Sequence, residues 1–226
     1  MIGALVVALA IMVGGTYAQF TDRAKITNHL QSGDMQLTLK RIDYTHMMLD
    51  DDGFVADVTP DGHDVVKDFS KEETNDNLFD LDNADRFVPG ASVSAKLVLS
   101  NEKANSVAAF NYWFTVKLAV AEGETLAALA EYLLLDVKFE NHSEWNVSNI
   151  KLSGDDKAHF DAETGEITIG TSQKPIGVLG VGASQTFTVT ISMDKNAPNG
   201  EGGVSNQAIS FDLVVHADQQ ITKPNA

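Results

Sequence analysis

Residues 19–31, Gln-Phe-Thr-Asp-Arg-Ala-Lys-Ile-Thr-Asn-His-Leu-Gln, alternate with a period of two between a largely apolar face and a polar face. Every odd position is polar, whereas the even positions are Phe20, Asp22, Ala24, Ile26, Asn28 and Leu30. Alternation of this kind is typical of a β-strand with one buried face and one face in water. The segment therefore predicts a strand in the N-terminal part of the chain.

The following segment is predicted to be a second, separate strand. Ser32, Gly33 and Asp34 interrupt the pattern, and the apolar residues then fall on the odd positions of Met35-Gln36-Leu37-Thr38-Leu39. A change of phase by one residue moves every side chain to the other face of a sheet. The two segments are therefore two strands, and Ser32 and Gly33 are predicted to form the hinge between them.

Much of the remaining chain also has the pattern of short strands. Turn-forming residues separate the runs, and there is no regular alternation of strands with helices that would indicate a parallel sheet. The predicted fold is therefore all-β, an antiparallel β-sandwich with helical and loop insertions. The predicted strands cover residues 92–100, 110–120, 135–139, 145–152, 186–193 and 209–215, with a hairpin over 161–169.

Four segments depart from the strand pattern. Residues 124–135 have high helix propensity, with three leucines on one face, and predict a helix. Residues 50–85 are acidic and rich in turn formers, so we expect a long excursion over the surface with a short helix near Lys71. Residues 177–183 are glycine-rich and predict a loop, and residues 219–226 predict a flexible tail.

The first residues have the form of an export signal. An apolar run from Ile2 to Val13 is followed by small residues that end at Ala18. The run is too short to span a bilayer as a stable helix and resembles the hydrophobic region of a signal peptide. We expect a signal peptidase to cut between Ala18 and Gln19 and remove residues 1–18. A buried core helix is the alternative for this run.

Charge and cysteine content narrow the function classes. The chain has a net charge of −16, which argues against nucleic-acid binding because neutralising phosphates needs clustered Lys and Arg. Copies of such a chain repel one another, so association is expected to be easier with salt, acid or divalent cations. The chain has no cysteine, so it has neither disulfides nor thiolate metal sites and must rely on its core. After removal of the leader, we expect no membrane partner.

Several motifs resemble the TasA/camelysin (CalY) family, whose members form biofilm matrix fibres in Gram-positive bacteria. The most specific is the leader, where Gly14-Gly15-Thr16-Tyr17-Ala18 is similar to the family's GGT-aromatic-A segment before the cut. The family's mature chains then open with an aromatic residue, an Asp and a Ser-Gly pair. In this sequence these are Phe20, Asp22 and Ser32-Gly33, and further matches are the strand 35–39, the turn Val88-Pro89-Gly90, the strand end 98–101 and the closing segments 206–211 and 214–220.

The resemblance implies a jelly roll over residues 32–218 and an N-terminal donor strand over 19–31. Such a strand leaves its own domain and completes the sheet of the next subunit, which gives a head-to-tail homopolymer. Here Phe20, Asp22, Ala24, Ile26 and Leu30 would enter the neighbour's groove. The residue pattern itself leaves two fates open, because the same strand fits the edge of its own sheet.

The sequence offers no persuasive catalytic or metal site. None of the six histidines begins an H-E-x-x-H motif, so the metallopeptidase activity with which the camelysin branch has been classed is not expected, and we predict no enzyme. Calcium is the only cofactor with candidate ligands, Asp80, Asp82 and Asp85, and a solvated acidic loop is favoured over it. Trp113, Trp145 and the aromatic residues of 110–114 fit a carbohydrate site less well than a core.

Three functional hypotheses follow. The first is a secreted fibre subunit of the extracellular matrix or cell surface, with other copies of itself and an anchoring or assembly protein as partners. The second is a non-polymerising surface accessory protein or adhesin, which keeps its first strand at home. The third, a camelysin-like metalloprotease, follows only from the family label.

Overall fold

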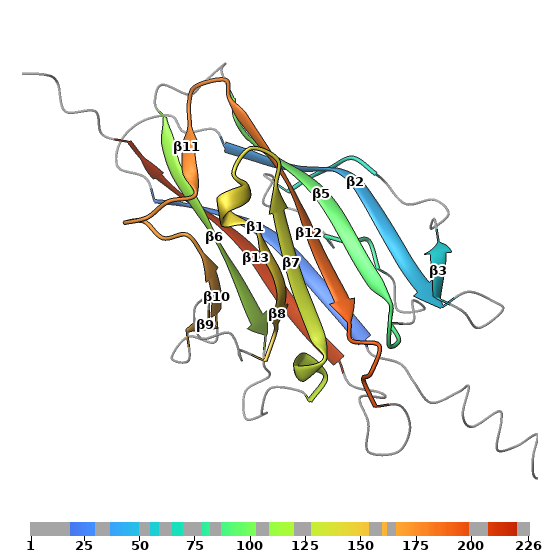
Figure 1. Cartoon of the computed structure of the whole chain (residues 1–226). Helices are drawn as coiled ribbons and strands as arrows, with labels where there is room; N and C mark the ends of the chain where they lie inside the picture. Colours follow the sequence, from blue (N-terminus) through green and yellow to red (C-terminus); the bar gives the residue numbers. More distant parts are fainter. Residues whose placement is uncertain are drawn as a thin grey trace, which may run out of the picture.

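The structure is a computed structural model, and it describes residues 19–29, 37–49, 55–58, 65–69, 78–81, 87–102, 109–119, 128–153, 160–161, 166–198 and 208–220. These residues form two sheets (Figure 1). The strands are β1 (Gln19–His29), β2 (Leu37–Leu49), β3 (Val55–Val58), β4 (Lys67–Asp68), β5 (Ser92–Asn101), β6 (Phe110–Ala119), β7 (Leu133–Phe139), β8 (Val147–Lys151), β9 (Phe160–Asp161), β10 (Glu166–Ile169), β11 (Gly177–Leu179), β12 (Ser184–Met193) and β13 (Ala208–Gln219).

The β1 sheet has the order β1-β13-β6-β10-β9, with β11 also paired to β6. The β2 sheet has the order β3-β2-β5-β12-β7-β8, with β4 also paired to β2. Every strand pair is antiparallel except β1 with β13. The all-β class and the antiparallel sheets are therefore confirmed, whereas the jelly-roll connectivity stays a prediction.

The two sheets pack face to face around aromatic residues. Phe114 on β6 has its ring centroid 4.6 Å from that of Phe187 on β12 and 5.6 Å from that of Phe139 on β7. Along β5 and β12 every second residue is buried, as strands with one core face require. Phe110 and Tyr112 are buried in the same core, so the core interpretation is confirmed for Phe110, Tyr112 and Phe114, whereas Trp113 and Trp145 are only partly buried.

The predicted strands are largely found. The predictions at 92–100, 110–120, 186–193 and 209–215 correspond to β5, β6, β12 and β13, and β9 pairs with β10 as the hairpin prediction requires. The predicted break after the first strand is also confirmed, because β1 and β2 belong to different sheets.

The predicted helix over residues 124–135 is wrong in its second half. The structure has a 3-10 helix, η1 (Ala128–Glu131), and strand β7 begins at Leu133. In the register of β7 with β12, Leu133 lies opposite Met193 and Leu135 opposite Ile191, and all four side chains are buried. Pairing and burial at this central position outweigh the helix propensity of the segment, which amounts to only a few tenths of a kcal/mol per residue.

Other expectations for the irregular segments need smaller corrections. The predicted loop at 177–183 contains strand β11, and β13 extends through Gln219, so the tail begins later than expected. The excursion at 50–85 is not only a surface segment, because it contains the short strands β3 and β4 and the buried residues Phe69, Leu78 and Phe79. Lys71 and the helix predicted near it lie outside the described residues.

Residues 88–91 form a tight turn. The Ala91 amide donates to the Val88 carbonyl at 2.8 Å, and Gly90 has a φ of 89°. A positive φ at the third residue of a turn after proline is the type II arrangement, which favours glycine there.

In the described part of the chain, no helix has the length and apolar character needed to span a membrane.

Candidate assembly site at the edge of the β1 sheet

Strand β1 lies at one edge of the β1 sheet, parallel to β13. The register runs without a shift from Gln19 opposite Ala208 to His29 opposite Asp218. Among the described strands, β13 is the partner that holds β1 in the sheet. Figure 1 shows the two strands, which come from opposite ends of the chain, side by side. The next strand along the chain, β2, belongs to the other sheet, so β1 is not joined to its partner β13 by a hairpin.

The register gives β1 a core side. Leu213, Val215 and Ala217 of β13 are buried, at 1%, 0% and 0% exposure. Ala24 lies opposite Leu213 and Ile26 opposite Val215. Asn28 lies opposite Ala217, while Asp22 lies opposite Phe211 and Phe20 opposite Ile209. The even positions Ala24, Ile26 and Asn28 therefore share register with the buried positions of β13.

The outer face of β13 is held to β6 by side chains as well as by the backbone. The His216 ring is stacked on Trp113 of β6, with centroids 5.2 Å apart and planes 7° apart. His216 Nε2 also lies 2.8 Å from Oγ1 of Thr115. These contacts belong to the β6 side of β13, so they fix its position without using β1.

Other residues predicted for this site lie outside the described residues. They are Ala18 at the predicted cut, Leu30 at the end of the predicted donor strand, and the predicted hinge residues Ser32 and Gly33.

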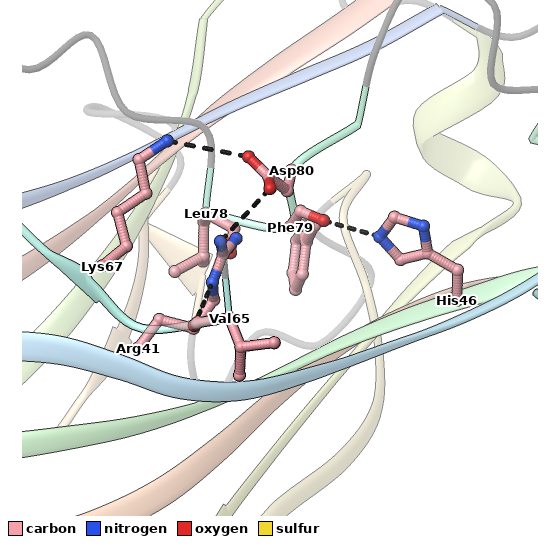
Figure 2. A network of polar contacts seen from close by, with 7 residues as sticks. All are labelled: Arg41, His46, Val65, Lys67, Leu78, Phe79 and Asp80. Carbon is pink, nitrogen blue, oxygen red and sulfur yellow. Dashed lines mark hydrogen bonds and ion pairs between the residues drawn. The ribbon is translucent and has the colours of Figure 1, made fainter. Parts of the chain in front are cut away.

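A second polar cluster, which joins Arg41 of β2 to residues 65–80, was missed by the sequence analysis (Figure 2). Arg41 is completely buried. Its Nε donates to the Val65 carbonyl at 3.2 Å, its Nη1 donates to the Leu78 carbonyl at 2.9 Å, and its Nη2 lies 3.4 Å from Oδ2 of Asp80. The guanidinium carbon also lies 4.6 Å from the centroid of the Tyr44 ring.

Two further contacts extend this cluster. Lys67 Nζ lies 3.6 Å from Oδ1 of Asp80, and Nε2 of the buried His46 donates to the Phe79 carbonyl at 2.6 Å. The network therefore holds the segment 78–80 against β2, as Figure 2 shows. One signal was available in the sequence, because Arg41 continues the odd-numbered apolar phase of Leu37 and Leu39.

The calcium candidates are placed only in part. Each carboxylate oxygen of Asp80 faces a cation, Arg41 or Lys67, while Asp82 and Asp85 lie outside the described residues. In the described part of the chain, no three His, Asp or Glu side chains gather as metal ligands would. The Asp80 carboxylate therefore acts as the anion of a buried ion-pair cluster.

A third polar group, formed by Tyr112, His142 and Glu144, lies near the first residue of β11. Among the described residues the buried Tyr112 hydroxyl has no hydrogen-bond partner, and burial, followed by the charge of Glu144, raises the pKa of Tyr112 well above its usual range. A Cβ on Gly177 would lie 3.1 Å from this hydroxyl and 3.0 Å from Nε2 of His142. His142 Nδ1 lies 3.3 Å from Oε1 of the exposed Glu144, and the hydrogen bonds of Glu144 to its own backbone and to His142 lower its pKa.

The chain matches no family model, no curated protein and no solved structure.

Proposed function

We propose that the protein is a secreted structural subunit of extracellular matrix fibres that polymerises head-to-tail by exchanging strand β1. The observation that carries the proposal is the place of β1 at the edge of its sheet, parallel to β13, with Ala24 and Ile26 in register with the buried Leu213 and Val215. The TasA/camelysin resemblance of the leader supports the same function. The proposed partners are other copies of the chain, with an anchoring or assembly protein at the cell surface.

The geometry of β1 is compatible with exchange, because the same contacts can form within one chain or between two. A strand from a neighbouring copy makes the same backbone hydrogen bonds and occupies the same register positions as the chain's own strand. Burial of a large apolar side chain such as Phe20 or Ile26 contributes about 1.5–3 kcal/mol in either case. Concentration and the connection over residues 30–36 then decide between the two, and short hinge segments favour exchange. The contact is heterologous, and repeated without closing into a ring it produces a filament.

A specific observation also favours the second candidate, a non-polymerising accessory protein or adhesin. In the structure β1 is paired within its own chain along its full length. A protein in which β1 stays paired with β13 of the same chain has an intact sheet and needs no partner. For the third candidate, a metalloprotease, the described residues offer no supporting cluster.

A cysteine pair across the seam between β1 and β13 distinguishes the first two candidates. Lys25 and Val214 are aligned, and neighbouring strands lie about 4.8 Å apart, within reach of a disulfide. The chain has no cysteine of its own, so every disulfide of the variant Lys25→Cys/Val214→Cys joins introduced cysteines, and peptide mapping identifies the 25–214 bond. The variant is expressed for export, concentrated under reducing conditions with added salt, and then oxidised. Denaturing gels without reductant then separate the products.

Exchange gives a ladder of covalent multimers, whereas pairing of β1 with β13 of the same chain gives an oxidised monomer. Negative-stain electron microscopy of the wild-type protein provides the companion result, with thin uniform filaments expected. A variant oxidised while dilute, and therefore locked as a monomer, is expected to form none until it is reduced. Oxidised monomers at every concentration, together with the absence of filaments, would favour the accessory or adhesin function.

A further inference from the structure

Strand β1 is a basic segment in an acidic protein. It carries Arg23 and Lys25 against a single acid, Asp22, whereas the chain as a whole has a net charge of −16. Both basic residues occupy odd positions, on the side of the strand opposite to the core positions. Another copy of this chain therefore presents the opposite charge to β1 before any contact is made.

The register shows which residues of β1 and β13 bring opposite charges together. Arg23 lies opposite Asp212 of β13, and His29 lies opposite Asp218. On the other side of β13, Asp212 is aligned with Lys117 of β6, whose Nζ lies 3.4 Å from Oε1 of Glu166 on β10. Charges along this row therefore alternate in sign from β1 to β10. Opposite charges at aligned positions stabilise a strand pair and like charges destabilise it.

Other registers that keep the same faces lose this agreement. A shift of β1 by two residues toward the start of β13 brings Lys25 opposite Asp212, but it places His29 opposite His216. A shift by two residues the other way leaves Asp212 opposite Thr21 and places Lys25 opposite His216. That second shift also brings the acid Asp22 opposite the buried Leu213. The observed register is the one of the three that pairs a basic residue with both acids of β13.

We infer that the negative charges of Asp212 and Asp218 on β13 select the β1 strand of a second copy of this chain and fix it in this register. The inference rests on the proposed exchange and adds what the acceptor strand recognises, an extended segment with basic residues six positions apart. Arg23 and Asp212 are the pair on which the test is built, because their charges do not depend on the protonation of a histidine.

Because a strand can pair within its own chain or with another copy, the test needs mixtures of two different chains. A charge change in one chain weakens the closed monomer and the homopolymer alike, since the same pair is present in both. Only mixtures of two chains report the selection. Donor chains carry Lys25→Cys, with or without Arg23→Asp, and acceptor chains carry Val214→Cys, with or without Asp212→Arg. The four mixtures of full-length exported chains are oxidised under identical conditions, and the covalent heterodimer is quantified.

The matched mixtures are Arg23 with Asp212 and R23D with D212R, and the mismatched mixtures pair like charges. We expect the coupling between the two changes to raise the matched yields about tenfold over the mismatched ones, and 1 M salt to reduce this ratio to about one. A fifth donor, Arg23→Asn with Lys25→Cys, controls for the loss of the arginine without the reversal. The ratio of its yields with the two acceptors measures how readily each acceptor releases its own strand, and the matched and mismatched yields are compared after correction for this ratio.

The outcomes separate the two claims. Equal heterodimer yields in all four mixtures would show that strands are exchanged without selection by charge. This result would overturn the inference and leave the proposed function standing. No heterodimer in the mixture with wild-type charges, at any concentration, overturns the exchange itself and the inference with it. Circular dichroism of each variant confirms that a low yield does not come from an unfolded chain.

Discussion

Arg41 and Asp80 form a buried ion pair, with Nη2 of the arginine 3.4 Å from Oδ2 of the aspartate and the arginine side chain fully excluded from solvent. The two residues come from segments that sequence patterns assign to different roles, a strand and an acidic excursion. Their contact, together with the hydrogen bonds of Arg41 to the Val65 and Leu78 carbonyls, ties the excursion to the β2 sheet.

The change Asp80→Asn tests this pair. It removes the negative charge that faces the buried guanidinium, and asparagine tolerates the positive φ of 61° at this position, so the backbone is not disturbed. We expect the free energy of unfolding in urea to fall by about 3 kcal/mol. Lys67→Ala removes the more exposed partner of the same carboxylate and should cost less than about 1 kcal/mol. Equal losses for the two variants would contradict a dominant role for the buried pair.

This pair also shows why the sequence predicted the strands better than the polar contacts. Alternation is a local property, so β5 and β12 are visible as strands without any knowledge of their partners. Arg41 lies in the apolar phase of β2, but an arginine in such a pattern is normally interpreted as the end of the buried stretch. Its partners are carbonyl groups and an aspartate of a distant loop, and no local pattern indicates them.

The same difference explains the helix error and the open question about β1. The segment from Leu133 to Leu135 has helix propensity but pairs with β12, a contact fixed by residues about 60 positions away along the chain. For residues 19–29, alternation predicted a strand and its faces. It did not predict a parallel partner, because parallel and antiparallel pairing place the same residues on the same face.

Gly170 is expected to be sensitive to substitution. It has a φ of 75°, and an added Cβ would lie 2.9 Å from Cγ1 of Ile176 and 3.1 Å from Cβ of Trp113. Gly170→Ala should lower the free energy of unfolding by about 2 kcal/mol, from the left-handed backbone and from the contact. Gly180→Ala is the matched control, because nothing lies within 4 Å of its added Cβ, and it should be nearly neutral. Chemical denaturation of both variants measures the difference.

Tyr112→Phe is expected to stabilise the protein. The hydroxyl is buried and has no hydrogen-bond partner in the described part of the chain, so its removal should raise the free energy of unfolding at pH 7 by about 1 kcal/mol. A loss of stability would instead indicate that the hydroxyl is hydrogen-bonded in solution. Thermal unfolding of the two proteins in parallel decides between these results.

The pH dependence of Tyr112 provides a separate prediction. Burial raises the pKa of Tyr112 in the folded protein above the value of about 10 in an unfolded chain. Above pH 10 the unfolded chain releases this proton and the folded chain keeps it, so the tyrosine's contribution to stability is complete below pH 10 and is lost as the pH rises. We expect the advantage of Tyr112→Phe over wild type to grow by about 1.4 kcal/mol per pH unit above pH 10. A constant difference from pH 7 to 11.5 would contradict the raised pKa.

The docking of β1 is tested by two substitutions at adjacent positions. Ile26 is aligned with Val215, which has no exposed surface, whereas Thr27 is aligned with the half-buried His216 on the outer face. Ile26→Asp places a charge at a core position and removes apolar burial, so it should destabilise the docked strand by about 3 kcal/mol or more. Thr27→Asp introduces the same charge at an outer position and should cost much less. Hydrogen exchange followed by mass spectrometry reads the result in peptides from residues 208–220. I26D should lose protection in these peptides relative to wild type, and T27D should retain it. Equal protection in both variants would mean that β13 does not depend on β1, and that the core positions of the first strand do not fix its place in the sheet.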